Sequence, residues 1–314
     1  MVTLASLSAI VTFEFPATFE VAGISVRWET VIGAAAVLAV LLIALAAARS
    51  TPLDVAAPAD WPSPDPDRPG PNHLREDDLL YIAVAALPGA LAGGRLGYAL
   101  IHLDYYTANP GALLDVTRGG LELSMGVVGG TITASIVAAL LGAPLGRWLH
   151  ALAIPLLVLL GLIKLAMVFG GSGQGVPADF SLATRYAGPG PWGSLAPDIP
   201  AWPAQAMEAL ATVLAGGIAW FFTAVGIFRR RNGAAFFLAV GLWAVARALV
   251  AATWRDPAVV GMLSAAQLLA LGLAAACTLL VVGFAAAIVG RTRSGDPGDD
   301  AQGGADGAPA WPGG

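Results

Sequence analysis

The chain has 314 residues, of which 57% are hydrophobic and only 12% are charged, and its net charge is −5. A soluble globular domain carries about a quarter charged residues, so this composition and a mean hydropathy of +0.74 exclude a soluble protein and indicate a polytopic membrane protein. The acidic excess lies in the first loop and the C-terminal tail, so no nucleic-acid partner is expected. One cysteine, Cys277, and three scattered histidines supply neither a disulfide framework nor a metal site. No metal and no cofactor are therefore expected, and Cys277 is interpreted as a small core residue.

Seven apolar stretches have about 20 residues or more, the length that a helix needs to cross a bilayer. The second, third and fourth are rich in glycine or contain a charge, which is typical of interior helices that pack closely. The sequence therefore predicts an all-α integral membrane protein with about seven transmembrane helices in a membrane domain of residues 30–289. The predicted helices occupy residues 30–48, 78–101, 119–142, 148–170, 204–228, 234–253 and 258–289.

The connecting segments differ in composition. Residues 50–77 are rich in proline and aspartate, which predicts a flexible loop, and residues 290–314 have the composition of a disordered tail. Residues 171–203 contain tryptophan and tyrosine, which suit a partly ordered loop at the membrane interface. Residues 1–29 are expected to lie on the same side as that loop.

The arginines of alternate connectors predict the orientation, because the more basic side of a membrane protein is usually cytoplasmic. The excess of arginines on one side predicts that the N-terminus and the 171–203 loop lie outside and that the C-terminus lies in the cytoplasm. One side has nine arginines: Arg49, Arg68, Arg75, Arg147, Arg229, Arg230, Arg231, Arg291 and Arg293; the other side has four: Arg27, Arg118, Arg185 and Arg255.

Three cations fall within predicted spans: Arg95, Lys164 and Arg247. Each costs about 2.5 to 3.5 kcal/mol at the bilayer centre on insertion scales, so each suggests a function. In one interpretation they pair internally, Arg95 with Glu122 and either Lys164 or Arg247 with Glu208. In the other, three cations exceed two anions, and the unmatched charge binds a phosphate, onto which guanidinium groups fork.

Glycines near these charges allow two interpretations as well. The run "RGGLELSMGVVGG" at 118–130 includes Gly119, Gly120 and Gly126, and "GGSGQG" follows at 170–175. Their free backbone N–H groups suit close approach to an anion or a lipid headgroup. Tight packing of helices through small residues is the alternative.

The order of these motifs resembles the prolipoprotein diacylglyceryl transferase family of bacterial plasma membranes, over residues 23 to about 285. Two of the motifs carry the arginines at positions 95 and 247, and another carries the glutamate at 208. The similar segments are "GISVRWE" (23–29), "GGRLGYALIHLDYYTANP" (93–110), "RGGLELSMGVVGG" (118–130), "WPAQAMEA" (202–209), "RALVAATWRDP" (247–257) and "GMLSAAQLLAL" (261–271).

The resemblance implies a multi-pass enzyme of the bacterial inner membrane. It would transfer the diacylglyceryl group of phosphatidylglycerol to the lipobox cysteine in the signal peptide of a prolipoprotein. Phosphate binding is the role implied for Arg95, Arg247 and Lys164. The candidate catalytic residues are Glu122, Glu208 and Ser124, and headgroup contacts are expected from Tyr98, Gln205 and the glycines Gly119, Gly120 and Gly126.

Several positions depart from the family pattern. Polar family residues are replaced, so a diverged member that binds an anionic phospholipid or lipopeptide without catalysis is the alternative. A transporter is a further alternative, although duplicated halves, which many transporters have, are not visible. The departures are Glu29, Ser124, Met167, Gly170, Ser172 and Ala251, where the family has tyrosine, histidine, asparagine, asparagine, glutamate and glutamate.

Overall fold

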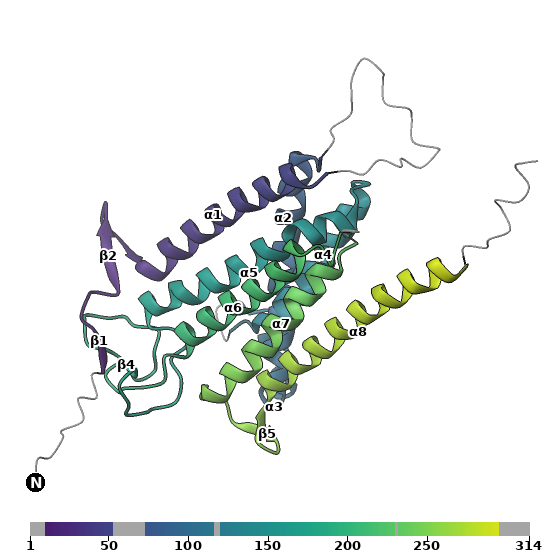
Figure 1. Cartoon of the computed structure of the whole chain (residues 1–314). Helices are drawn as coiled ribbons and strands as arrows, with labels where there is room; N and C mark the ends of the chain where they lie inside the picture. The colour runs from purple at the N-terminus through teal and green to yellow at the C-terminus, as the bar shows by residue number, and fades with distance from the viewer. Residues whose placement is uncertain (1–9, 53–72, 116–119, 230–231, 295–314) are drawn as a thin grey trace, which may run out of the picture.

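The computed structural model describes residues 10–52, 73–115, 120–229 and 232–294 (Figure 1). Seven helices in these ranges are long and apolar enough to cross a membrane, so the predicted fold class is confirmed. Gly119, Arg68, Arg118, Arg230, Arg231, most of the 50–77 loop and most of the 290–314 tail lie outside the described residues. The seven helices are α1 (Trp28–Ser50), α2 (Glu76–Ile101), α4 (Leu123–Leu140), α5 (Leu145–Gly170), α6 (Ala204–Ala224), α7 (Ala234–Val250) and α8 (Ala265–Ser294).

Two predicted helix starts are wrong, each for a local reason. The third span begins at Leu123 rather than at 119, because Glu122 is extended and its carboxylate caps the helix by accepting from the N–H groups of Ser124 and Met125. The last span begins at Ala265 rather than at 258. The apolar residues before it form a hairpin of β5 (Ala258–Val260) and β6 (Leu263–Ser264) instead.

One end of the bundle, which we call the strand end, carries the short strands and α3 (Leu103–Ala108) (Figure 1). There β1 (Val11–Phe13) pairs in parallel with β4 (Thr184–Tyr186). The hairpin of β2 (Thr18–Val21) and β3 (Ile24–Arg27) leads into α1. The β5–β6 hairpin lies at the same end. Because β4 belongs to the 171–203 loop, the pairing of β1 with β4 joins the N-terminal segment to that loop.

Helices α2 and α4 pack against each other through glycines. A Cβ atom at Gly129 would lie 2.1 Å from the carbonyl oxygen of Gly89, and one at Gly93 would lie 2.3 Å from the carbonyl oxygen of Met125. Such contacts leave no room for a side chain. The close approach of these two backbones fixes the strand-end residues of α2 beside the N-terminus of α4.

Helix α7 lies at the centre of the bundle. It is the most buried of the seven, with contacts to α5, α6 and α8. Its residues Trp243 and Val240 form part of a core that also includes Leu157 and Leu160 of α5. Cys277 of α8 is buried in the same core, as expected from the sequence. The last turn of α7 carries Arg247 towards the strand end.

Candidate active site

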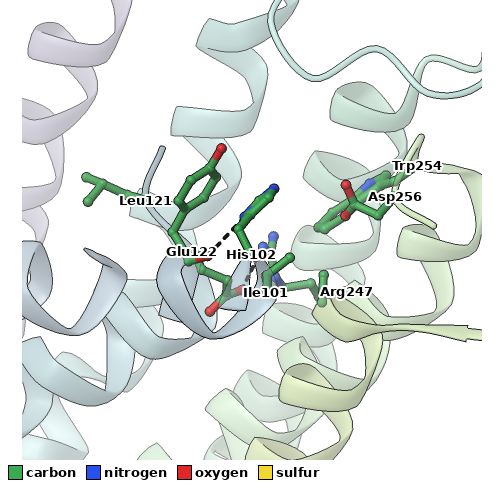
Figure 2. Close-up of a pocket in the computed structure, with 9 residues that line it drawn as sticks. Ile101, His102, Leu121, Glu122, Arg247, Trp254 and Asp256 are labelled. Atoms are coloured by element: carbon green, nitrogen blue, oxygen red, sulfur yellow. Dashed lines mark hydrogen bonds and ion pairs between the residues drawn. The ribbon is translucent and has the colours of Figure 1, made fainter. Parts of the chain in front are cut away.

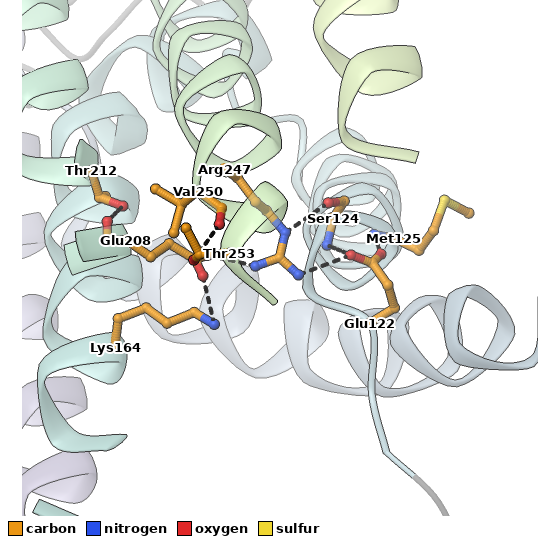
Figure 3. A network of polar contacts seen from close by, with 9 residues as sticks. All are labelled: Glu122, Ser124, Met125, Lys164, Glu208, Thr212, Arg247, Val250 and Thr253. Carbon is orange, nitrogen blue, oxygen red and sulfur yellow. Dashed lines mark hydrogen bonds and ion pairs between the residues drawn. The ribbon is translucent and has the colours of Figure 1, made fainter. Parts of the chain in front are cut away.

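Arg247 is the centre of a buried polar network (Figure 3). Its side chain is only 5% exposed. One terminal nitrogen lies 3.1 Å from Glu122 Oε1, the other lies 2.5 Å from Glu208 Oε1, and Nε donates to Ser124 Oγ at 3.2 Å. Arg247 therefore ties the N-terminus of α4 to α6.

Lys164 of α5 completes the network. Its Nζ lies 3.0 Å from Glu208 Oε2, on the side of that carboxylate away from Arg247. The prediction that Lys164 or Arg247 pairs with Glu208 is confirmed, and both cations do so. Because two cations meet two carboxylates here, the network is balanced, and each buried charge has the partner that its desolvation demands.

Arg95 does not belong to this network, so the predicted pair of Arg95 with Glu122 is wrong. Its Nε donates to the carbonyl of Leu113 at 3.0 Å, and one terminal nitrogen donates to those of Ala112 and Asp115 at 2.6 and 2.7 Å. The other terminal nitrogen reaches the carbonyl of Gly120 at 3.5 Å. Carbonyls of a turn thus satisfy this guanidinium, which holds the segment after α3 against α2.

A cavity of about 160 Å³ opens beside Arg247 at the strand end (Figure 2). Tyr98 of α2 forms one wall, and its ring stacks on His102 with centroids 4.2 Å apart. Gly120 leaves room for that ring, because a Cβ there would lie 2.9 Å from it. The lining residues are Tyr98, Ile101, His102, Leu121, Glu122, Arg247, Trp254, Asp256 and Ala266.

Trp254 is a site residue that the sequence analysis missed. The Cζ atom of Arg247 lies 4.5 Å from the centroid of its ring, and Nζ of Lys164 lies 5.6 Å from it. Both are within the range of cation–π attraction. It follows α7 and the 3₁₀ turn of Ala251–Thr253 in an extended conformation, so helical spacing in the sequence could not indicate its place beside Arg247.

Of the glycines predicted to contact a headgroup, Gly126 faces helix α2 and Gly120 adjoins the cavity. A Cβ atom at Gly126 would lie 3.4 Å from the carbonyl oxygen of Ala90 on α2, an ordinary van der Waals distance. Gly120 instead adjoins the cavity through Tyr98. In the described residues, histidine, cysteine, aspartate and glutamate side chains form no group of three that could hold a metal ion.

A sequence model of the prolipoprotein diacylglyceryl transferase family matches residues 16–283. The chain belongs to this family. It is 30% identical to the phosphatidylglycerol–prolipoprotein diacylglyceryl transferase of Geobacter sulfurreducens over 61% of this chain and 70% of that protein. It is 31% identical to the enzyme of the same name from Rhodospirillum centenum, over 63% of this chain and 69% of that protein. The similarity to the Finegoldia magna enzyme, at 31% identity, covers 24% of this chain and 38% of that protein.

Positions at which this chain departs from the family pattern meet in a second polar cluster at the strand end. Glu29 begins α1, and its Oε2 accepts from Ser172 Oγ at 2.9 Å and from Arg27 at 3.2 Å. Gly170 is close by, since a Cβ there would lie 2.0 Å from Oε2 of Glu29. Glu29, Gly170 and Ser172 are positions at which the resemblance of the sequence implies other residues in the family. In this chain α1 supplies the carboxylate of the cluster.

Gln205 contacts the 171–203 loop rather than the cavity. Its Nε2 donates to the hydroxyl of Tyr186 at 2.9 Å, and that hydroxyl donates to the carbonyl of Val168 at 2.9 Å. Burial raises the pKa of Tyr186 to about 12, so the hydroxyl remains a donor at any physiological pH. This chain of hydrogen bonds anchors the loop to α5 and α6.

Proposed function

We propose that this protein transfers the diacylglyceryl group of phosphatidylglycerol to the lipobox cysteine thiol of a prolipoprotein in the bacterial inner membrane. The observation that carries the proposal is the position of Arg247 in the wall of the strand-end cavity. A guanidinium has five N–H donors, and the described residues accept three of them. Two donors are thus left for a phosphate oxygen.

The reaction requires a fixed cation beside the leaving group. The thiolate sulfur forms a bond to the glyceryl carbon, and the bond from that carbon to the phosphate oxygen breaks. The departing glycerol phosphate gains negative charge, which a preorganised cation in a low-dielectric site stabilises. Arg247 supplies that cation, and Lys164 shares the Glu208 carboxylate with it, so Glu208 does not neutralise Arg247 alone.

Glu122, Glu208 and Ser124 are proposed to hold Arg247 in place for this reaction. Both oxygens of Glu122 accept N–H groups, and both oxygens of Glu208 face a cation. Proton uptake by either carboxylate would break one of these contacts. Their role is therefore the orientation of the guanidinium, which preorganises its remaining donors.

Arg95 is proposed to support the site without contacting the phosphate. Binding a phosphate directly would require its guanidinium to leave the carbonyls of Leu113, Ala112 and Asp115. By holding those carbonyls, it fixes residues 112–115 against α2. Tyr98, which follows Arg95 on α2, and the other residues that line the cavity are proposed to receive the lipid headgroup.

We further propose that the strand end faces outward. Arg49 and Arg75 lie at the opposite end, as do Arg147 and Arg229, and the positive-inside rule makes that end cytoplasmic. In this orientation the cavity opens on the side where a secreted prolipoprotein presents its cysteine. The seven helices then form one membrane domain of residues 30–289, with the 171–203 loop outside.

Incubation of membranes that contain the protein with labelled phosphatidylglycerol and a lipobox peptide tests the proposal. We expect thioether-linked diacylglyceryl peptide and released glycerol phosphate. A peptide with serine in place of the lipobox cysteine is the control and should remain unlabelled. An unmodified cysteine peptide, with phosphatidylglycerol still bound by the protein, would overturn the proposal and favour the diverged binder.

Trp254→Ala is expected to lower kcat/KM for transfer about tenfold. The ring neighbours both cations, and a cation–π contact is worth about 0.5 to 2 kcal/mol. Trp254→Phe keeps an aromatic face and should stay within about threefold of the wild type. Trp220→Ala is the matched control, because this tryptophan is 61% exposed and lies more than three turns beyond Glu208 along α6. Equal kcat/KM for Trp254→Ala and Trp220→Ala would contradict the role of Trp254.

A further inference from the structure

His102 enters the strand-end cavity from the segment that also carries Arg95 and Tyr98, and the function proposed above gives it no catalytic role. It caps the C-terminus of α2, is exposed, and lines the cavity together with Glu122 and Arg247 (Figure 2). It is thus reachable both from solvent and from the place where the leaving phosphate would meet Arg247. A side chain there is in a position to exchange a proton with an incoming group.

The surroundings of His102 fix its tautomer. Nδ1 lies 3.0 Å from the carbonyl oxygen of Tyr98. A carbonyl can only accept, so this contact requires the proton on Nδ1, and the neutral ring then carries its lone pair on Nε2. The Tyr98 ring lies against the imidazole, tilted by 30° with the centroids 4.2 Å apart, and restrains its rotation. In the described part of the chain, no residue bonds to Nε2.

The other titratable and charged groups around His102 are less suited to accept a proton. On α4, Glu122 already accepts from two backbone N–H groups and from Arg247 of α7. Asp256, before β5, is exposed on the far wall, and Asp104 lies on α3. A carboxylate is by type a weaker base than an imidazole. Tyr98 serves as the aromatic partner of the imidazole.

We propose that His102 is the general base that accepts the thiol proton of the acceptor cysteine, an inference that rests on the proposed transferase function. The S–H bond breaks, its proton goes to Nε2, and the thiolate attacks the glyceryl carbon of the phospholipid. The carbon–oxygen bond to the phosphate breaks, and its electron pair leaves with glycerol phosphate. The imidazolium then releases the proton to solvent, so the net products are thioether, glycerol phosphate and one proton.

The pH profile of His102→Gln distinguishes a base from a structural residue. General base catalysis contributes about 10² to 10⁴ in rate, so we expect kcat/KM to fall about 100-fold at pH 7. A cysteine thiol has an ordinary pKa of about 8.5 and ionises without help at higher pH. The deficit should therefore shrink to a few-fold by about pH 9.5, and binding of phosphatidylglycerol vesicles should be unchanged.

Two matched variants complete the test. His73→Gln, at the opposite end of the bundle, should keep the wild-type rate at every pH. Asp256→Asn should show no pH-dependent deficit if the base is His102. A constant deficit of His102→Gln at all pH values, a rate within twofold of the wild type, or a pH-dependent deficit in Asp256→Asn would each overturn the role of His102 while leaving the transferase function intact. A wild-type protein without transfer would overturn both.

Discussion

Arg247→Ala is expected to destabilise the protein by about 3 to 5 kcal/mol and to abolish transfer. The substitution leaves Glu122 and Glu208 buried without their shared cation, and breaking a buried pair from one side costs about this much. Lys164 still faces Glu208, so Glu122 suffers more. The measurement is the thermal unfolding of the purified protein in detergent, together with the transfer assay.

Two further variants separate the roles of Arg247 in folding and in chemistry. Arg49→Ala removes an exposed ion pair with Glu76 and should leave the unfolding temperature unchanged. Arg247→Met combined with Glu122→Gln removes the cation together with the carboxylate that only this cation neutralises, while Glu208 keeps its ion pair with Lys164, so this double variant should recover much of the stability but none of the activity. Wild-type stability of Arg247→Ala would show that the network is not a buried ion-pair system. Activity in the double variant would contradict the phosphate role.

The seven helices could be predicted from the sequence because a span requires a long apolar stretch, which composition alone reveals. Their starts could not always be predicted. The run from 258 to 264 is as apolar as the helix after it, yet it contains Gly261 at φ +59° and turns back as a hairpin. The capping role of Glu122 was likewise hidden, since its carboxylate was considered as a partner for cations and as a catalytic group, but not as a helix cap.

The charged residues of the candidate site could be predicted from the sequence, but several of their contacts could not. The sequence identifies Lys164, Arg247 and Glu208 as charges that must be satisfied in an apolar environment, and these pair. It could not show that Arg95 would be satisfied by carbonyl groups, because every residue of a turn offers one. Trp254 and His102 were missed because their significance depends on the direction in which each side chain leaves its helix end.

Gly129→Ala is expected to destabilise the α2–α4 pair by about 3 kcal/mol and to reduce transfer strongly. The added methyl group would lie 2.1 Å from the carbonyl oxygen of Gly89, which is backbone and cannot rotate away. Overpacking of this kind typically costs about 1 to 3 kcal/mol, and the helices must separate to relieve it. Since α2 carries Tyr98 and His102 to the cavity, their distance from Glu122 on α4 would grow as well.

The control for this prediction is Gly217→Ala on α6, where nothing lies within 4 Å of the added Cβ. Alanine is favoured over glycine in a helix by about 1 kcal/mol, so this variant should be as stable as the wild type or slightly more stable. Both substitutions add the same methyl group to a membrane helix, so helix propensity alone would shift their unfolding temperatures in the same direction. A lower unfolding temperature for Gly129→Ala alone would attribute the effect to the contact with Gly89, and equal unfolding temperatures would contradict it.

If the cavity depends on this contact, the loss of activity in Gly129→Ala should appear even at temperatures where the protein is fully folded, because the residues that line the cavity come from both helices of the pair.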